Sequence, residues 1–509
     1  MNRFKRTVAR TFVLMAMLTF ISKILGFVRE MVIANFYGTT YIVDAYVMAT
    51  SIPNILFGGL FAAISTAYIP TYSTINEDRG AQESNTFTSQ IINLLVLLSA
   101  TAGLIGISFS DEITAIFANG FSGEVAALTS KFIKITFSYV LFSSIAAILD
   151  AHMQYKGFFL KPIISGYFQN VGIIIIVIIS AYTYHYYLVF GLLIGSCFRL
   201  IYISVNARKS GYHYSPNFSL GEPIKKILYM SIPVFIGSSV FQINSFVDKA
   251  LASGLPEGSV SALNYGMILI SLITGLTVTL LVTLIYPKIT KAFTLENLEE
   301  FNNIVEKGTG TIAIITIPFS MGILIFSDEV VQIVYERGAF DPTATALTSG
   351  AFFFYGIGLV FFSFNELLIK VFYSMRNTKA PIVCSGISVI INITLNLLLI
   401  EPMAHKGLAL ATSIAAMTNS LLLYLWMRKK YPKIKIIGSG MKILKVIITS
   451  FFAVLAAWVV NNLLISLIWM PRAVYLFIAV SCAAFLYLLL LKLFNVEDVK
   501  MIRLIFKRQ

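Results

Sequence analysis

The chain has 509 residues, of which 57% are hydrophobic and only 12% are charged, with a mean hydropathy of +0.83 and a net charge of +14. Soluble domains average about 25% charged residues, so this composition argues against a soluble enzyme and indicates a protein whose helices cross a membrane many times. The three cysteines and four histidines are scattered, which argues against a disulfide framework or a metal cluster.

Apolar runs along the chain predict an all-α polytopic membrane protein with fourteen transmembrane helices and short connecting loops. The predicted spans are centred near residues 22, 55, 99, 140, 170, 195, 238, 274, 317, 358, 390, 416, 453 and 481.

The basic residues predict how these spans are oriented. If the N-terminus is cytoplasmic and the spans alternate, most of the 38 lysines and arginines fall on the cytoplasmic side, including the cluster between Arg428 and Lys445. This is the positive-inside pattern, and it predicts cytoplasmic N- and C-termini. The positive charge is then explained by orientation and by contact with anionic membrane lipids, so no nucleic-acid partner is expected.

Short motifs recur 217 to 220 residues further along the chain. The sequence FSDEI at 109–113 returns as FSDEV at 326–330, and PIISG at 162–166 returns as PIVCSG at 381–386. A third, looser match relates the segment that ends at Tyr46 to the one that ends at Tyr265. Three matches at one offset indicate an internal repeat.

Six predicted spans separate the two copies, and an even number keeps them parallel. We therefore expect two pseudo-symmetric six-helix lobes, at residues 1–215 and 216–432, followed by a C-terminal helix pair with a cytoplasmic tail at residues 433–509. Parallel repeats of this kind place a substrate site between the halves, near the middle of the membrane.

The first span carries Lys23, Arg29 and Glu30 inside an apolar run. Each such group costs roughly 2.5–3.5 kcal/mol at a bilayer centre, so we expect these side chains to face protein or water. Two cations suit a phosphate-bearing or otherwise anionic group. Gly26, three residues before Arg29, would let a backbone or a ligand approach closely.

Other interpretations of this span remain open. The charged residues could lie near a helix end and reach the interface with their long side chains. They could also form an internal ion pair with a structural role, either between Lys23 and Glu30 or between Arg29 and an acid such as Asp44.

Two further polar groups lie in other spans. Ser51, Pro53 and Asn54 in the second span predict a kink with a polar group beside it, for which a structural role is the better interpretation. In the seventh span, Asp248 could bind a cation or relay a proton, although a neutralised pair of Asp248 and Lys249 near the outer interface is the slightly better interpretation.

The eleventh and twelfth spans carry Asn392, Asn396 and Thr412. Together with Asp248 these residues could form an all-oxygen site for a hard cation such as Na⁺. From the spacing alone, hydrogen bonding between helices is the better interpretation, because it is common in membranes.

Motifs along the whole chain resemble those of MurJ/MviN lipid II flippases, within the multidrug/oligosaccharidyl-lipid/polysaccharide exporter superfamily. The opening sequence SKILGFVRE at residues 22–30 carries the resemblance, continued by Asp44 and by Pro53 and Asn54. The sequences ERGAFD at 336–341, FYSMRNTKAP at 372–381 and GLALATS at 407–413 also match.

The resemblance implies a transporter and not an enzyme, placed as a multi-pass protein in the bacterial cytoplasmic membrane. Its implied activity in peptidoglycan biosynthesis is to move lipid II, an undecaprenyl-diphosphate-linked muropeptide, from the inner to the outer leaflet by alternating access. The implied drive is the membrane potential or a coupling ion, Na⁺ or H⁺, with no other cofactor. Lipid II or a related glycolipid, membrane lipids and the cell-wall synthesis machinery are the implied partners.

The resemblance also implies site residues. The substrate-binding set is Lys23, Gly26, Arg29, Glu30, Asp44 and Asn54. The ion set is Asp248, Asn392, Asn396, Thr412 and the carbonyl of Leu408, with Asn396 in place of the family's usual aspartate. Phe57 and Ile268 stand where many members have arginine, so this chain has fewer cations to hold a diphosphate.

Rival functions come from different classes of protein. One is a flippase for another undecaprenyl-linked polymer, and another is a cation-coupled drug exporter of the same superfamily, whose cationic substrates Lys23 and Arg29 should repel. An intramembrane glycan polymerase would need catalytic acids or histidines on a large outer loop, and the loops here are short. A protein of this fold that has lost transport is the fourth alternative.

Overall fold

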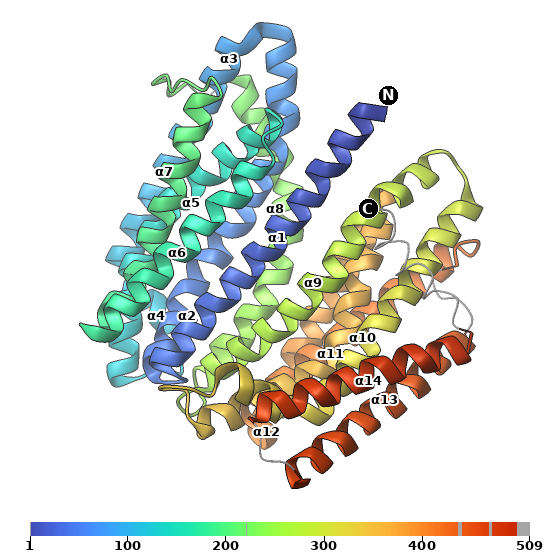
Figure 1. Cartoon of the computed structure of the whole chain (residues 1–509). Coiled ribbons are helices and arrows are strands. Elements are labelled where there is room, and N and C mark those ends of the chain that lie inside the picture. Colours follow the sequence, from blue (N-terminus) through green and yellow to red (C-terminus); the bar gives the residue numbers. More distant parts are fainter. Residues whose placement is uncertain (1, 220, 436–439, 468–470, 496–509) are drawn as a thin grey trace. The chain divides into compact units, whose positions relative to one another are not determined.

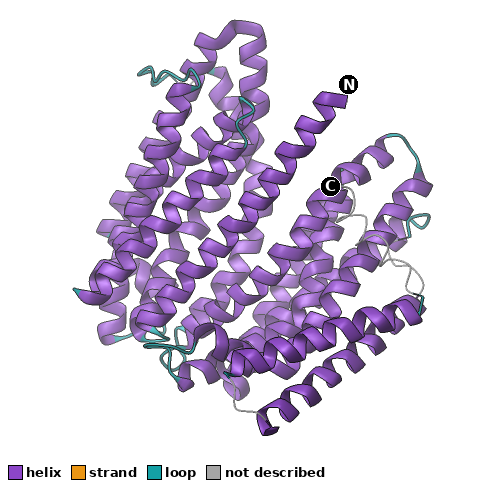
Figure 2. Cartoon of the chain, in the orientation of Figure 1, coloured by secondary structure: helices purple, strands orange, loops and turns teal. Residues whose placement is uncertain are grey.

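The computed structural model describes residues 2–219, 221–435, 440–467 and 471–495. Helices and loops make up this part of the chain, and no strand occurs in it (Figure 2). The all-α prediction is therefore confirmed for the described residues. The predicted cytoplasmic tail after Asn495 lies outside them.

The chain divides into two compact units, whose helices are labelled in Figure 1. The first unit contains residues 1–261 and 337–340, and the second contains residues 262–336 and 341–509. The prediction of two six-helix lobes and a separate C-terminal pair stays a prediction.

The helices of the first unit follow one another with short connections. They are α1 (Asn2–Tyr37), α2 (Tyr41–Pro53), η1 (Asn54–Gly58), α3 (Gly59–Ser108), α4 (Ser110–Phe117), α5 (Gly123–Tyr155), α6 (Leu160–Tyr182), η2 (His185–Val189), α7 (Phe190–Lys209) and α8 (Glu222–Ala252).

The second unit contains almost all of α9 (Ser259–Thr294) and the helices that follow it. These are α10 (Leu298–Tyr335), α11 (Pro342–Ser374), α12 (Lys379–Lys430), α13 (Gly440–Leu467) and α14 (Arg472–Leu493).

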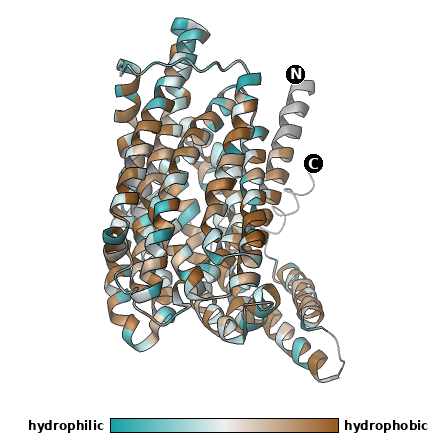
Figure 3. Ribbon diagram, turned by 90° about the vertical axis from the view of Figure 1, so that its left-hand side faces the viewer, coloured by the Kyte–Doolittle hydropathy of each residue, from teal (hydrophilic) through white to brown (hydrophobic). Residues whose placement is uncertain are grey.

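Ten helical stretches among the described residues are long and apolar enough to cross a membrane. Two of them are much longer than the roughly 20 residues that one crossing needs. The stretch Tyr41–Ser108 leaves helical geometry at Gly80, and Lys379–Lys430 does so at Ala404. Hydrophobic residues dominate the length of the helices, while the connecting loops are more hydrophilic (Figure 3).

Each unit has its own apolar core. In the first unit α3 packs on α5 and α8, α1 packs on α6, and α6 packs on α7. In the second unit α11 packs between α10 and α12, and α13 lies beside α14 and against α10. The core of the second unit also draws buried aliphatic side chains from α9, including Val278, Val282 and Ile289.

The internal repeat is visible in the backbone. Phe109, at the start of the first FSDE motif, has φ −114° and ψ 28° and separates α3 from α4. Phe326, at the start of the second motif, has φ −115° and ψ 22° and bends α10 at the corresponding point. The same residue thus makes the same bend in both copies.

Candidate functional site

Arg29 is held in place by two partners within the first unit. Its Nε donates to Oε1 of Glu30 at 3.0 Å, its Nη2 donates to the same oxygen, and its Nη1 donates to Oδ1 of Asn170 on α6 at 3.1 Å. The exposed fractions of the Arg29 and Glu30 side chains are 28% and 12%. A guanidinium has five N–H groups. These three hydrogen bonds fix the orientation of the Arg29 guanidinium and leave two N–H groups for a further acceptor.

The acid that pairs with Arg29 is therefore its neighbour Glu30. Of the two ion pairs that the sequence allows, the structure contains the arginine pair and not the one between Lys23 and Glu30. Within the described residues, no hydrogen bond or ion pair engages the ammonium group of Lys23, which is half-buried one turn and a half earlier on α1.

Gly26 lies on α1 between these two cations. A methyl group added at Gly26 would meet only Oδ1 of Asn170, at an ordinary 3.9 Å. No backbone within van der Waals reach therefore requires glycine here. The predicted role of Gly26 in ligand approach stays a prediction.

Asp44 is not the partner of Arg29, and that expectation is wrong. The carboxylate of Asp44 is buried with an exposed fraction of 3%, and its two oxygens accept the backbone N–H groups of Gly258 and Ser261, both at 2.7 Å. These N–H groups belong to the first turn of α9 and the residue before it, where a helix favours a negative charge. The physical reason is that the N–H groups at the start of α9 have no partner within the helix and therefore bind the carboxylate of Asp44. The guanidinium of Arg29 is already paired with Glu30.

The second span changes its helical geometry directly after Pro53, where the sequence predicts a kink. α2 ends at Pro53, and the next five residues form a π-helical turn before α3 begins. Asn54 sits in this turn, donates to the carbonyl of Thr50 at 3.0 Å and accepts a hydrogen bond from the hydroxyl of Tyr139 on α5. Such turns are often found at functional sites.

Two polar residues that the sequence reasoning did not assign to this region also belong to it. Asn170 orients Arg29, and the ammonium of Lys249 donates to Oγ of Ser51 on α2 at 2.9 Å. A signal for Asn170 was present, because Gln169 and Asn170 interrupt an otherwise apolar span. Phe57, where relatives of the resembled family carry arginine, instead packs against the rings of Phe61 and Phe137.

The predicted ion-site residues of α12 form one hydrogen-bonded cluster in the second unit. Nδ2 of Asn396 donates to Oδ1 of Asn392 at 3.0 Å, and Nδ2 of Asn392 donates to Oγ1 of Thr412 at 3.2 Å. Oγ1 of Thr412 donates to the carbonyl of Leu408 at 3.1 Å. All four residues are buried. Their amide, hydroxyl and carbonyl oxygens are the neutral donors that a hard cation accepts.

Asp248, the predicted carboxylate ligand, is buried on α8 in the first unit. The five-residue ion site therefore stays a prediction. Histidine, cysteine, aspartate and glutamate side chains form no group of three that could hold a metal ion within the described part of the chain.

Comparison with known proteins gives a consistent result. The family model described as lipid II flippase MurJ matches residues 33–476. A probable lipid II flippase MurJ from Rickettsia prowazekii is 30% identical over 438 residues, which cover 84% of this chain and 85% of that protein.

Solved structures agree with this assignment. A lipid II flippase MurJ in an inward closed conformation superposes with a TM-score of 0.83 at 26% identity, covering 96% of this chain and all of that one. A multidrug resistance transporter of the MATE family, in an inward-facing conformation, gives a TM-score of 0.64 at 14% identity over 81% of this chain and 95% of that one. The second likeness is one of fold alone.

Proposed function

The chain belongs to the lipid II flippase MurJ family, and from that premise we propose that it moves lipid II from the inner to the outer leaflet of the bacterial cytoplasmic membrane. The family is one of transporters, and the ten apolar helical stretches in the described part of the chain fit a multi-pass membrane protein. Lipid II carries a diphosphate between its polyprenyl tail and its sugar, so its transporter needs cations at membrane depth.

The observation that carries this proposal is the arrangement around Arg29. The guanidinium is oriented by Glu30 and Asn170 and keeps two N–H groups for an acceptor, while Lys23 adds a second cation on the same helix. Arginine recognises phosphate through paired N–H groups, so a fixed guanidinium is the right device for a diphosphate. With Phe57 and Ile268 in place of arginines, Arg29 and Lys23 bear more of this task here than in the resembled relatives.

Complementation of a bacterium depleted of its own lipid II flippase tests this role. We expect Arg29→Ala to lower the number of colonies at least tenfold relative to the unmodified chain at equal membrane expression, and Arg29→Lys to fall between the two. Lys134→Ala removes an exposed cation from α5 and should grow like the unmodified chain. Full growth with Arg29→Ala would show that the guanidinium does not handle substrate.

Native mass spectrometry in detergent separates lipid II from the rival substrates. We expect lipid II to bind better than undecaprenyl phosphate carrying no diphosphate or sugar, and binding to weaken in Arg29→Ala. Preference for a cationic drug over lipid II would favour the exporter interpretation instead.

The finer architecture belongs to the same proposal. Fourteen spans follow if α1 and α8 cross the membrane and if the stretches broken at Gly80 and Ala404 each cross it twice. Both termini are then cytoplasmic. The polyprenyl tail would stay in lipid along α13 and α14, as the family resemblance implies.

We also propose Na⁺ as the coupling ion, with oxygen atoms of the α12 cluster among its ligands. The oxygen donors of Asn392, Thr412 and Leu408 support this choice because none of them needs to lose a proton to bind. Thermal unfolding in NaCl against choline chloride at equal ionic strength gives a readout that does not depend on transport. We expect Na⁺ to raise the unfolding temperature of the unmodified chain and of Ser388→Ala, but not of Asn392→Ala. An equal rise in all three would refute the site.

A further inference from the structure

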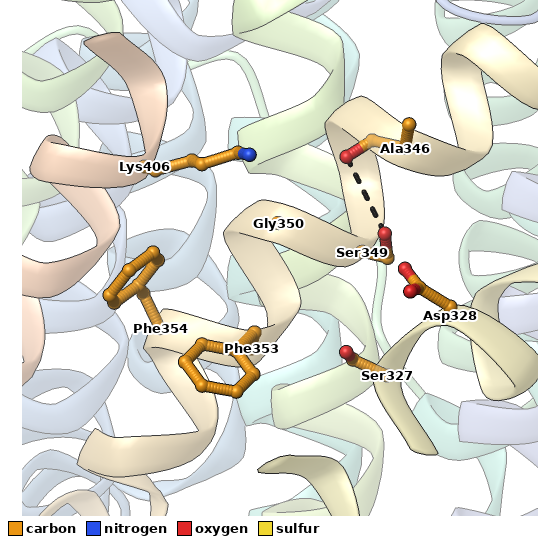
Figure 4. A pocket seen from close by; sticks show the side chains of 8 residues that line it. All are labelled: Ser327, Asp328, Ala346, Ser349, Gly350, Phe353, Phe354 and Lys406. Carbon is orange, nitrogen blue, oxygen red and sulfur yellow. Dashed lines mark hydrogen bonds between the residues drawn. The ribbon is translucent and has the colours of Figure 1, made fainter. Parts of the chain in front are cut away.

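A cavity of about 360 Å³ lies in the second unit, and none of the predicted substrate or ion residues lines it (Figure 4). Ser327 and Asp328 of α10 form one wall, and Lys406 of α12 forms the opposite one. The floor comes from α11 and consists of Ala346, Ser349, Gly350, Phe353 and Phe354. The volume is at the lower end of the range for small-molecule sites, which run from about 300 to 1,000 Å³.

The position of Lys406 is set by the backbone around it. α12 breaks two residues earlier at Ala404, which has a left-handed φ of 51°, and Nε2 of His405 bonds the carbonyl of Leu347 on α11 at 2.9 Å. The aliphatic part of Lys406 then crosses Gly350, where an added methyl group would lie 2.5 Å from Cε. Only glycine at position 350 lets the lysine side chain take this path without moving.

The opposite wall offers an acceptor and two hydroxyl groups. Ser327 and Ser349 are buried, with exposed fractions of 8% and 3%, while Asp328 reaches into the opening. Ser349 donates to the carbonyl of Ala346 in its own helix at 3.4 Å (Figure 4). Across the described residues, neither the carboxylate of Asp328 nor the ammonium of Lys406 takes part in a hydrogen bond or an ion pair.

The first copy of the internal repeat contains the same trio of residues in a different arrangement. Ser110, Asp111 and Ser130 occupy the matching positions in the first unit, 217 to 219 residues earlier. There the trio is closed, because Oγ of Ser130 bonds Oδ1 of Asp111 at 2.5 Å and Oγ of Ser110 at 2.9 Å. The second copy keeps the three residue types but leaves the aspartate and serine apart.

The sequence differs in two places that open the second copy. The position of Gly350 is occupied in the first unit by Lys131, and that of Phe353 by Lys134. At the positions of these two exposed lysines the second unit has a glycine and a phenylalanine, and its cation comes instead from Lys406 of α12. The first copy is therefore a closed trio, and the second is an open cavity with one cation and one anion.

We propose that this cavity binds a small zwitterion. An ammonium group on the ligand is placed at Asp328, a carboxylate or phosphate is placed at Lys406, and the apolar part lies against Phe353 and Phe354. Charge-assisted hydrogen bonds at both ends make the site selective for a molecule that carries both charges. Two sources share this chemistry, the phosphoethanolamine head group of a membrane lipid and a free dipeptide. This second site does not depend on the proposed flippase function.

Isothermal titration of the full chain in detergent tests the proposal with two soluble probes, O-phosphoethanolamine and alanyl-alanine. We expect saturable binding of at least one probe, and a Kd at least tenfold higher in Lys406→Met and in Asp328→Asn. Gly350→Ala keeps both charges and displaces only the lysine, so it should weaken binding as well. Lys131→Met removes an exposed lysine from the first copy, at the position that matches Gly350, and should bind the probes like the unmodified chain.

The results separate the two sources. Binding of phosphoethanolamine, with retention of phosphatidylethanolamine over phosphatidylglycerol in native mass spectrometry, identifies a lipid head group. Binding of the dipeptide alone identifies a free peptide or amino acid. Failure of both probes to bind the unmodified chain overturns the proposal, as does binding of plain phosphate or acetate that is unchanged in Asp328→Asn. Because Asp328, Lys406 and Lys131 are exposed, the three variants that replace them should keep the unfolding temperature of the unmodified chain.

Discussion

At the scale of single residues, Arg29 and Asp44 show two uses of charge inside a membrane protein. Arg29 is paired by a neighbour and steered by Asn170, which leaves part of its hydrogen-bonding capacity open. Both carboxylate oxygens of Asp44 accept hydrogen bonds from backbone N–H groups. The first arrangement suits a ligand, and the second suits a structural joint. The family resemblance implies that Asp44 binds substrate, whereas its geometry supports a structural role.

Replacing Asp44 should destabilise the protein and not merely slow transport. Asp44→Ala leaves two buried N–H groups without an acceptor, at about 1–3 kcal/mol each. Asp44→Asn should cost less, because one amide oxygen remains. Thermal unfolding in detergent measures both, and Asp78→Asn on the exposed part of α3 is the control that should not change. An unfolding temperature for Asp44→Ala equal to that of the control would contradict this role.

At the scale of elements, α3 contains two glycines one turn apart that differ in their surroundings. A methyl group at Gly106 would lie 2.2 Å from Cγ of Phe137 on α5, and 2.6 Å from its Cβ, whereas one at Gly103 would meet nothing within 4 Å. Gly106 therefore lets α3 and α5 approach, and Gly103 does not serve this purpose.

These surroundings predict opposite effects for the same substitution. Gly106→Ala should destabilise the protein by about 1–3 kcal/mol, because the base of the Phe137 ring cannot move aside without shifting the backbone. Gly103→Ala should stabilise α3 by up to about 1 kcal/mol through helix propensity. Thermal unfolding of the two variants, side by side, checks the order. Equal unfolding temperatures would show that α3 and α5 are not packed as closely as described.

At the scale of the whole molecule, the proposed orientation makes a prediction about access from outside the cell. In a chain without its three cysteines, Ser122→Cys should react in intact cells with a thiol reagent that cannot cross the membrane, and Arg79→Cys should react only after lysis. Both positions are exposed: Arg79 directly precedes the break at Gly80 in α3, and Ser122 is the residue before α5. Labelling of Arg79→Cys in intact cells would reverse the proposed topology.

The features that can be predicted from the sequence depend on neighbouring residues, whereas those that cannot depend on contacts between residues far apart in the chain. The sequence predicts the helical spans and the change of geometry after Pro53, because both depend on neighbouring residues. It also predicts the repeat, because similar motifs recur at one offset. Asn170, which orients Arg29, lies 141 residues from it, and the partners of Asp44 lie at least 214 residues away, so periodicity gives the face of a helix but not what meets it. The α12 cluster was predictable from the spacing of Asn392 and Asn396, whereas the zwitterion cavity depends on a break at Ala404 that brings Lys406 to Gly350.

The shared bend at Phe109 and Phe326 also bears on the ancestry of the chain. Two stretches of otherwise divergent sequence keep the same residue and the same backbone angles. A shorter ancestor with one copy and an even number of crossings would have inserted in a single orientation, and two such subunits could pair about a two-fold axis along the membrane normal. Fusion of such a pair would free each copy to change alone. The closed trio of the first copy and the open cavity of the second are what such independent drift would leave.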